Sequence, residues 1–350
     1  MLIKYDDARE MCISIFLGAG ASPSEAEIVS DGLVESNLMG VDSHGMIRIP
    51  QYLGEVKSGA IVPGAPVEVI FQTPNSAIVD GNHNFGMVCA EHMVMTAIRK
   101  AESANIAVVS SRHCNHVGRL GAYTCVMAES GLFAFACANG GRHGHLVTPF
   151  GGLDGRLSTN PISYAAPTSS DPIVLDMSTS TIAEGKIRLM QQQGRKIPPM
   201  CAIDADGNET DDPSAFYGPP MGRILPLGGP FGYKGYGLSM MVEILGSALS
   251  GVGPKEEYEG DSYMNGFFIL AISPAVFNAS GTFVGHVDAL KEYVLSSRPR
   301  EGHGKVSMPG EPDFSVRADR MEKGIPISDG TWETIALAAE SVGVDARRYG

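Results

Sequence analysis

Apolar side chains recur at helical spacing in the first part of the chain and predict two helices there. The first begins at a capping box over residues 22–25, with Pro23 at the first helical position, and ends at Gly40. A polar turn over residues 41–45 follows, and a second amphipathic stretch covers residues 46–53. The apolar positions of the first helix are Ala26, Ile28, Val29, Leu33 and Val34.

Helical and strand-like segments are mixed along the rest of the chain, which predicts a mixed α/β fold. The predicted strands cover residues 106–109, 132–138, 265–273 and 304–308, with further short strands within 59–86 and 139–233, one of them over 171–176. The predicted helices cover residues 87–103, 120–129, 234–250 and 332–342, and Gly251 caps the third of them.

Length and charge exclude several classes of function. The 350 residues carry 26 Lys and Arg against 39 Asp and Glu, a net charge of −13, so the cationic surface that non-specific nucleic-acid binding needs is missing. Anionic membrane surfaces are disfavoured for the same reason. No apolar run approaches the roughly 20 residues that span a bilayer. Acidic and basic residues within 1–20 replace the apolar core of a signal peptide. We expect a soluble, cytoplasmic protein that binds a small molecule.

The numbers and positions of the cysteines and glycines further restrict the class of protein. The six cysteines are too few for a disulfide scaffold, none forms a C-x-x-C pair, and most lie in apolar surroundings, so we expect buried free thiols. The 43 glycines exceed the usual share of roughly 7% and are dispersed. They indicate many tight turns and close backbone approaches, as enzymes that bind extended cofactors require.

The common nucleotide-binding and hydrolase motifs are absent. Residues 18–20 form a Gly-Ala-Gly sequence, but a helix precedes it and the third glycine of a Rossmann fingerprint is missing. No P-loop, no G-x-S-x-G and no H-E-x-x-H sequence occurs. A dinucleotide, if bound, must therefore be bound on another architecture.

The first polar cluster covers residues 42–45 and Arg48. His44 follows a helix exit and can exchange a proton near neutral pH, while Ser43 can orient its imidazole. Arg48 offers a guanidinium fork suited to a carboxylate. The same spacing also fits a polar surface turn without a catalytic role.

The second polar cluster covers residues 112–121, after a predicted strand and at the start of a predicted helix. The free N–H groups of that helix start are suited to a phosphate, although a plain connecting loop fits equally well. His113 and His116 are spaced for a metal, but only His143 and His145 offer further ligands, so a metal-dependent hydrolase is a minor alternative.

Two further clusters lie in the second half of the chain. Asp176 ends an apolar strand, a frequent position for a catalytic acid and equally for a helix cap; residues 158–161 and 185–186 flank it in the sequence. Residues 228–237 form a glycine-rich segment that leads into the strongest predicted helix. The spacing alone indicates an enzyme with a small anionic substrate.

Taken in order, these segments resemble the type-2 malate/L-lactate dehydrogenase family, which also contains cyclic imino-acid reductases. The matching segments are Asp42-Ser43-His44-Gly45 with Arg48 and Tyr52, Asn115-His116-Val117-Gly118, Thr159-Asn160-Pro161, Leu175-Asp176-Met177-Ser178 with Gly185-Lys186, Lys234-Gly235-Tyr236-Gly237 and Pro309-Gly310-Glu311. The resemblance spans nearly the whole chain.

The resemblance implies a non-Rossmann nicotinamide-binding α/β fold with mixed sheets and a helical N-terminal segment. It implies NAD as cofactor, with NADP as the alternative, a homodimer, and hydride transfer at C2 of a small 2-hydroxy or 2-oxo acid. A reductase of cyclic imino acids shares every motif and is the alternative function; a binding protein without activity is a remote one. We expect residues 1–105 with 305–350 to form a substrate-side domain, and residues 106–304 the nicotinamide domain.

The resemblance also assigns roles to single residues. Ser43 and His44 form a proton relay, Asp176 donates a proton or orients that relay, and Arg48 with Tyr52 binds the substrate. His116 is the alternative acid or base, although we favour it as a residue that lines the nicotinamide site. The expected cofactor-binding residues are His116, Gly118, Leu120, Gly121, Thr159, Asn160, Asp176, Met177, Ser178, Lys186, Pro299, Arg300 and Glu301; no metal is expected.

Two positions depart from the family pattern. Val117 stands where the family commonly has an aromatic residue, so a stacking or packing contact is lost. The histidine- and glycine-rich stretch over residues 140–145 is unusual and is positioned to shape a substrate pocket. Both departures concern the substrate rather than the class of reaction.

Overall fold

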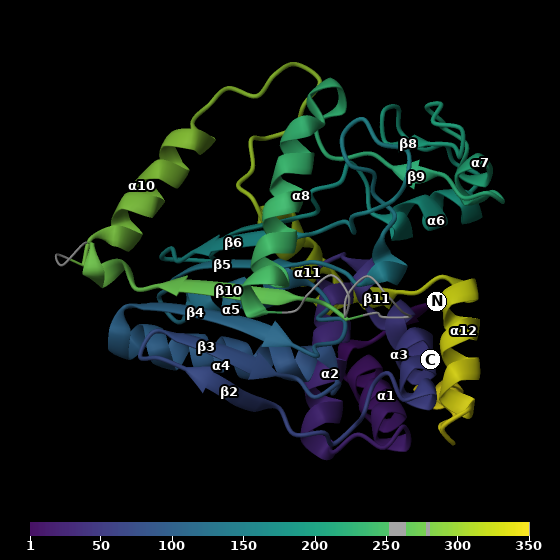
Figure 1. The fold of residues 1–350 in the computed structure, drawn as a ribbon, viewed down its shortest axis with the longest axis horizontal. Helices are drawn as coiled ribbons and strands as arrows, with labels where there is room; N and C mark the ends of the chain where they lie inside the picture. Colours follow the sequence, from purple (N-terminus) through teal and green to yellow (C-terminus); the bar gives the residue numbers. More distant parts are fainter. Residues whose placement is uncertain (252–263, 278–280, 350) are drawn as a thin grey trace.

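A seven-stranded mixed sheet is the centre of the computed structural model, which describes residues 1–251, 264–277 and 281–349 (Figure 1). The strand order is β2-β3-β4-β10-β5-β6-β7, and only β3 and β4 pair in parallel. A doubly wound Rossmann sheet is mostly parallel, so this topology differs from it. The strands are β2 (Glu68–Gln72), β3 (Ser76–Asp80), β4 (Ile106–Arg112), β5 (Phe133–Ala138), β6 (Ile162–Ala166), β7 (Ile173–Met177) and β10 (Phe267–Ile272).

Helices cover both faces of this sheet because its central strands are apolar on both sides. Phe267 and Ile269 of β10 belong to the core beneath α4 (Gly86–Ala104) and α5 (Leu120–Glu129). Phe268, the residue between them, points to the other face and packs with Val242 of α8 (Tyr233–Gly246). The alternation places successive residues of one strand in two separate cores.

A second core joins the N-terminal helices to the last helix of the chain. It packs α1 (Tyr5–Gly18), α2 (Pro23–Leu38) and α3 (Ile49–Ser58) against α12 (Asp329–Glu340). The short strands β1 (Leu2–Ile3) and β11 (Ile325–Pro326) pair beside them, so the two ends of the sequence lie together (Figure 1).

The remaining elements lie in the second half of the chain. A small third core contains α6 (Glu184–Gln192), α7 (Pro213–Tyr217), β8 (Ala202–Ile203) and β9 (Arg223–Ile224). Two further helices, α10 (Phe283–Leu295) and α11 (Glu311–Lys323), follow β10 in the sequence. No described helix is long and apolar enough to cross a membrane.

Most elements predicted from the sequence are confirmed. The capping box is present at α2, where Ser22 and Glu25 exchange both hydrogen bonds, and Gly40 follows the helix with a φ of +77°. The helix predicted over 120–129 is α5 with the same bounds. Five of the six free cysteines are buried, while Cys201 is partly exposed.

Some predicted boundaries and one strand are wrong. The stretch predicted over 46–53 is a 3-10 turn followed by α3, which continues to Ser58, and the helix predicted over 234–250 ends at Gly246 before a 3-10 turn. The strand predicted over 304–308 does not form. Lys305 pairs with Glu311 at the start of α11 there, and the segment has no ladder partner.

Candidate active site

The turn after α2 is fixed by one asparagine side chain. Asn37 donates from Nδ2 to Asp42 Oδ1 at 2.7 Å and accepts the Met46 N–H at Oδ1 at 2.7 Å. A Cβ at position 45 would lie 2.2 Å from the same Oδ1, so only glycine fits there. Asp42 also pairs with Arg320 of α11 at 2.6 Å. Both sides of the 42–45 turn are therefore held.

This turn brings Ser43, His44 and Arg48 into one group. Ser43 Oγ lies 3.0 Å from His44 Nδ1, within hydrogen-bond distance. The Arg48 Nε–H donates to the Ser43 backbone oxygen at 2.7 Å, and Nη1 donates to Gln51 Oε1 at 2.7 Å. Among the described residues, the remaining nitrogen of Arg48, Nη2, has no hydrogen-bond partner and is available to a ligand.

His116 is held beside this group by Tyr52. The Tyr52 hydroxyl lies 2.7 Å from His116 Nδ1, and the His116 ring stacks on His44 with centroids 5.6 Å apart and planes at 20°. The loop before His116 is fixed by Asn115, whose Nδ2 donates to the backbone oxygens of Ala60, His83 and Asn84. Two imidazoles, a phenol and a guanidinium therefore meet at one place.

The local charges favour neutral imidazoles. Burial, together with the positive charges of Arg48 and Arg119, lowers the pKa of His44 to about 3. Burial, Arg48 and His44 lower the pKa of His116 well below its usual value. Burial raises the pKa of Tyr52. The protein without ligand thus holds both histidines in the form that accepts a proton.

Asp176 lies on β7 and faces the start of α5. Its Oδ2 accepts the Gly121 N–H at 2.7 Å. A Cβ at position 121 would lie 2.8 Å both from this oxygen and from Arg119 Nη1, so the glycine lets the carboxylate and the guanidinium approach each other. Burial raises the pKa of Asp176, although Arg119 and the Gly121 N–H oppose the rise and Asp313 adds to it. No hydrogen bond joins Asp176 to Ser43 or His44 in the described chain, so its part in a relay stays a prediction.

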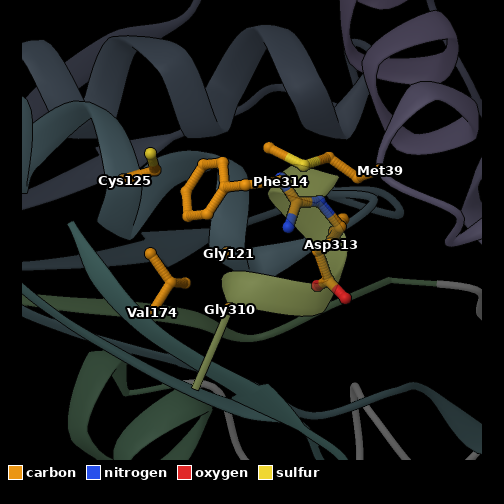
Figure 2. Close-up of a pocket in the computed structure, with 8 residues that line it drawn as sticks. Met39, Gly121, Cys125, Val174, Gly310, Asp313 and Phe314 are labelled. Atoms are coloured by element: carbon orange, nitrogen blue, oxygen red, sulfur yellow. The ribbon is translucent and has the colours of Figure 1, made fainter. Parts of the chain in front are cut away.

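A cavity of about 10 Å³ lies beside Arg119, on the side of α5 that faces α11 (Figure 2). Arg119 is 7% exposed, and its Nε has no hydrogen-bond partner among the described residues. The residues around the cavity are Met39, Arg119, Gly121, Cys125, Val174, Gly310, Asp313 and Phe314. Its volume suits about one water molecule.

The Thr159–Asn160 segment forms part of a separate buried network. Asn160 has a positive φ of +40° and donates from Nδ2 to Ser239 and to Glu243 Oε1, at 2.7 Å for the carboxylate. The second oxygen of Glu243 accepts from Asn139 Nδ2 at 2.7 Å. Because Nδ2 is directed at these acceptors, Oδ1 of Asn160 points elsewhere, and it is buried without a partner among the residues that the structure describes.

The other predicted cofactor residues differ in how far they are buried. Gly118 and Leu120 are buried beside the loop of His116. Gly185, which belongs to a matching segment but was not predicted to bind the cofactor, lies against Ser43, to which a Cβ at 185 would come within 3.1 Å. Met177 and Ser178 are half-buried at the end of β7, whereas Lys186 is exposed on α6. Pro299, Arg300 and Glu301 are exposed after α10, and within the described chain no hydrogen bond or ion pair joins them to the other predicted residues.

The histidines considered as metal ligands have other partners. His113 Nδ1 lies 2.9 Å from Asp80 Oδ1, and its ring lies beside that of His83. The residues that the structure describes contain no group of three or more side chains of His, Cys, Asp or Glu arranged to hold a metal ion.

Several polar residues near the site were not singled out from the sequence. Gln51 follows Arg48 by three positions and Glu55 follows Gln51 by four, which is the signal of one helix face and could have identified them. Arg119 lies within the second polar cluster, over residues 112–121, but no role was predicted for it. Asn139, Glu243 and Asn265 meet only through the folding of the sheet, so no local pattern indicates them.

Comparison with known proteins identifies the family. The malate/L-lactate dehydrogenase model matches residues 3–336. A malate dehydrogenase of Pyrococcus horikoshii is 34% identical over 98% of this chain and 96% of its own length. The solved sulfolactate dehydrogenase of Methanocaldococcus jannaschii has a TM-score of 0.89 at 31% identity, covering 100% of this chain and 99% of that one. The Δ1-piperideine-2-carboxylate reductase of Pseudomonas syringae has a TM-score of 0.84 at 28% identity, covering 97% and 99%.

These matches confirm the expected family and the mixed α/β fold outside the Rossmann class. The related dehydrogenases act on hydroxy acids, which supports the expected class of reaction, oxidation and reduction. The chain belongs to the malate/L-lactate dehydrogenase family and is an oxidoreductase.

Proposed function

We propose that the protein is a nicotinamide-dependent oxidoreductase that transfers hydride to or from C2 of a small 2-hydroxy or 2-oxo acid. The observation that carries this proposal is the joined group of Ser43, His44 and Arg48. It places a carboxylate anchor, Arg48, four positions after a proton acceptor, His44. A carboxylate anchor and a proton acceptor suit the hydroxy acids for which two relatives are named, malate and sulfolactate.

Arg48 is the anchor for the substrate carboxylate. Two of its nitrogens are held by Ser43 and Gln51, so the guanidinium is oriented before a ligand arrives. The free Nη2 and the outer N–H of Nη1 present parallel donors, the arrangement that binds a carboxylate through two hydrogen bonds. An anchor fixed in this way places C2, the neighbour of the carboxylate, next to the adjoining imidazole.

His44 is the residue that moves the proton. In the direction of oxidation, a neutral His44 accepts the hydroxyl proton of the substrate, and Ser43 orients the ring through Nδ1. The substrate carboxylate neutralises part of the Arg48 charge that lowers the pKa of His44. Binding therefore raises the pKa of His44 towards the range in which it exchanges protons. Asp176 is assigned a second, orienting role near the cofactor.

The structure offers suitable groups for the cofactor. The buried Oδ1 of Asn160, which has no partner in the described part of the chain, suits the amide of a nicotinamide, and Gly121 and Gly185 keep Cβ atoms away from the site. The nicotinamide supplies or accepts the hydride when bound. The expected contacts are His116, Gly118, Leu120, Gly121, Thr159, Asn160, Asp176, Met177, Ser178, Lys186 and residues 299–301. We expect NAD, with NADP as the alternative.

A reductase of cyclic imino acids is the second candidate. The reductase from Pseudomonas syringae has the same fold, and a cyclic imino acid carries the same carboxylate next to the reacting carbon. Arg48 and His44 suit it equally, because the imine nitrogen takes the place of the carbonyl oxygen. The same residues, Arg48 and His44, could therefore bind and reduce either a 2-oxo acid or a cyclic imino acid.

We further propose a homodimer in the cytoplasm. Leu238, Met241 and Ile244 project from one face of α8 and are about half exposed, and α10 buries none of its side chains although it carries Leu290 and Tyr293. Apolar faces of this kind are commonly covered by a partner, and we assign a second copy of this chain.

The free cysteines are typical of a reducing compartment, which supports the proposed cytoplasmic location. The division into residues 1–105 with 305–350 and residues 106–304 stays a prediction.

The proposed reaction is tested by following the absorbance of NADH and NADPH with a panel of substrates. The panel contains pyruvate, oxaloacetate, sulfopyruvate, 2,3-diketogulonate, Δ1-piperideine-2-carboxylate and Δ1-pyrroline-2-carboxylate. Turnover of a 2-oxo acid supports the first candidate. Turnover of cyclic imines alone replaces it by the second, and no turnover of any compound with either cofactor contradicts both.

The carboxylate anchor predicts the effect of Arg48→Lys. A lysine supplies one point charge in place of two parallel donors, so we expect KM for the acid to rise about tenfold or more with a smaller change in kcat. Steady-state kinetics measure both constants, and Arg347→Lys on the exposed C-terminal turn is the matched control. A KM equal to that of the wild type would remove Arg48 from this role.

The proton-transfer role predicts that His44→Ala lowers kcat by about 10²–10⁴-fold, the usual contribution of a positioned acid or base. His116→Ala should mainly weaken NADH binding, because we place it against the nicotinamide. Turnover and NADH fluorescence titration separate the two effects. If His44→Ala keeps its kcat while His116→Ala loses it, the roles of the two histidines are exchanged.

The lowered pKa of the half-buried His44 predicts a loss of stability in acid. The pKa of His44 is about 3 in the folded protein against an ordinary 6.5, so the unfolded chain binds an additional proton between these values. The free energy of unfolding should fall as the pH falls from 6.5 towards 3, and less steeply in His44→Gln. Urea denaturation at several pH values measures the slope, with the exposed His286→Gln as control. Equal slopes in wild type and His44→Gln would contradict the assignment.

A further inference from the structure

A chain of hydrogen bonds runs from the carboxylate anchor into the protein core along α3. Arg48 Nη1 donates to Gln51 Oε1 at 2.7 Å, and Gln51 Nε2 donates to Glu55 Oε1 at 2.8 Å. The three residues are spaced by three and four positions, so they lie on one face of the helix. The function proposed above uses the contact of Gln51 with Arg48, but it gives Glu55 no part.

The chemistry of the three groups fixes the direction of this chain. A guanidinium can only donate, so the amide oxygen of Gln51 must face Arg48. The amide NH₂ must then face Glu55, whose oxygen accepts. The Gln51 amide cannot be turned over without breaking both bonds, and this makes the chain a rigid support for one edge of the guanidinium.

The burial of Glu55 indicates that it serves more than folding. Glu55 is only 5% exposed, and its second carboxylate oxygen, Oε2, has no partner in the part of the chain that the structure describes. A buried carboxylate with one unsatisfied oxygen costs stability. Burial raises the pKa of Glu55, while Gln51 and Arg48 act in the opposite direction. An apolar residue at this position would cost the folded state less free energy.

Within the described residues, the other edge of Arg48 is held by the backbone alone. Its Nε–H donates to the Ser43 oxygen, and this single bond leaves the guanidinium free to pivot about it. Gln51 supplies the second point of attachment, and Glu55 fixes Gln51. Two points define the plane of the guanidinium and therefore the direction in which its free N–H groups meet a carboxylate.

We propose that Gln51 and Glu55 are positioning residues that orient Arg48 and so set the affinity for the substrate carboxylate. The inference rests on the proposed function, in which Arg48 is the anchor. It extends that function by naming two residues that act on substrate affinity without contact to the substrate. Gln51→Met, which keeps the length of the side chain and removes both hydrogen bonds, should release the guanidinium.

The test compares Gln51→Met, Glu55→Leu and Glu55→Gln with wild type, using the 2-oxo acid of the panel that the wild-type enzyme reduces fastest. We expect Gln51→Met and Glu55→Leu to raise KM about tenfold, the usual effect of a lost hydrogen bond to a charged group. The expected kcat stays within about twofold, and the dissociation constant of NADH by fluorescence is unchanged. Glu55→Gln keeps an acceptor for Gln51 and should stay near the wild-type KM. Lys57→Met, at an exposed position of α3, is the matched control.

The outcomes separate this inference from the proposed function. A wild-type KM in Gln51→Met, when Arg48→Lys raises KM, overturns the positioning role and leaves the anchor in place. A joint loss of kcat, NADH binding and melting temperature in Gln51→Met shows a purely structural role and also overturns it. An Arg48→Lys variant with unchanged KM removes the anchor and this inference together. Gln51→Met alone decides the question if Glu55→Leu does not fold.

Discussion

The bond from Arg48 Nε to the Ser43 backbone oxygen joins the two chemical parts of the site. It ties the guanidinium to the same turn that presents Ser43 and His44, so anchor and proton acceptor move as one unit. The turn itself depends on Asn37, which holds residues on both sides of it and leaves no space for a Cβ at position 45. In the proposed function, substrate orientation therefore depends on a few short contacts at the end of α2.

Positive charge in a buried place couples binding to proton transfer. Arg48 and Arg119 both lower the pKa of His44, and neither forms an ion pair with a carboxylate in the described chain. In the proposed function, a substrate carboxylate on Arg48 offsets part of this positive charge, which makes the imidazole more basic while the substrate is bound. Gln51 and Glu55 belong to the same arrangement, because they hold Arg48 at the cost of a buried carboxylate oxygen without a partner.

Local patterns in the sequence predict the parts of this molecule that depend on neighbours in the chain. The capping box at α2, the bounds of α5 and the group of Ser43, His44 and Arg48 are of this kind. The contact of Tyr52 with His116 joins residues 64 positions apart, and that of Asn160 with Glu243 joins residues 83 apart. Such pairs depend on the strand order, in which β10 lies between β4 and β5. The spacing of apolar residues along the chain does not predict that order. The strand expected over 304–308 failed for the same reason, because a ladder requires a neighbour that the fold does not provide.

In the proposed function, Arg48 receives the substrate carboxylate beside His44. A crystal structure of the protein with NADH and oxamate, a stable analogue of a 2-oxo acid, tests it most directly. We predict that the oxamate carboxylate lies on the free N–H groups of Arg48, with its carbonyl oxygen within hydrogen-bond distance of His44. An oxamate bound elsewhere, or with its carboxylate turned away from Arg48, would contradict the account.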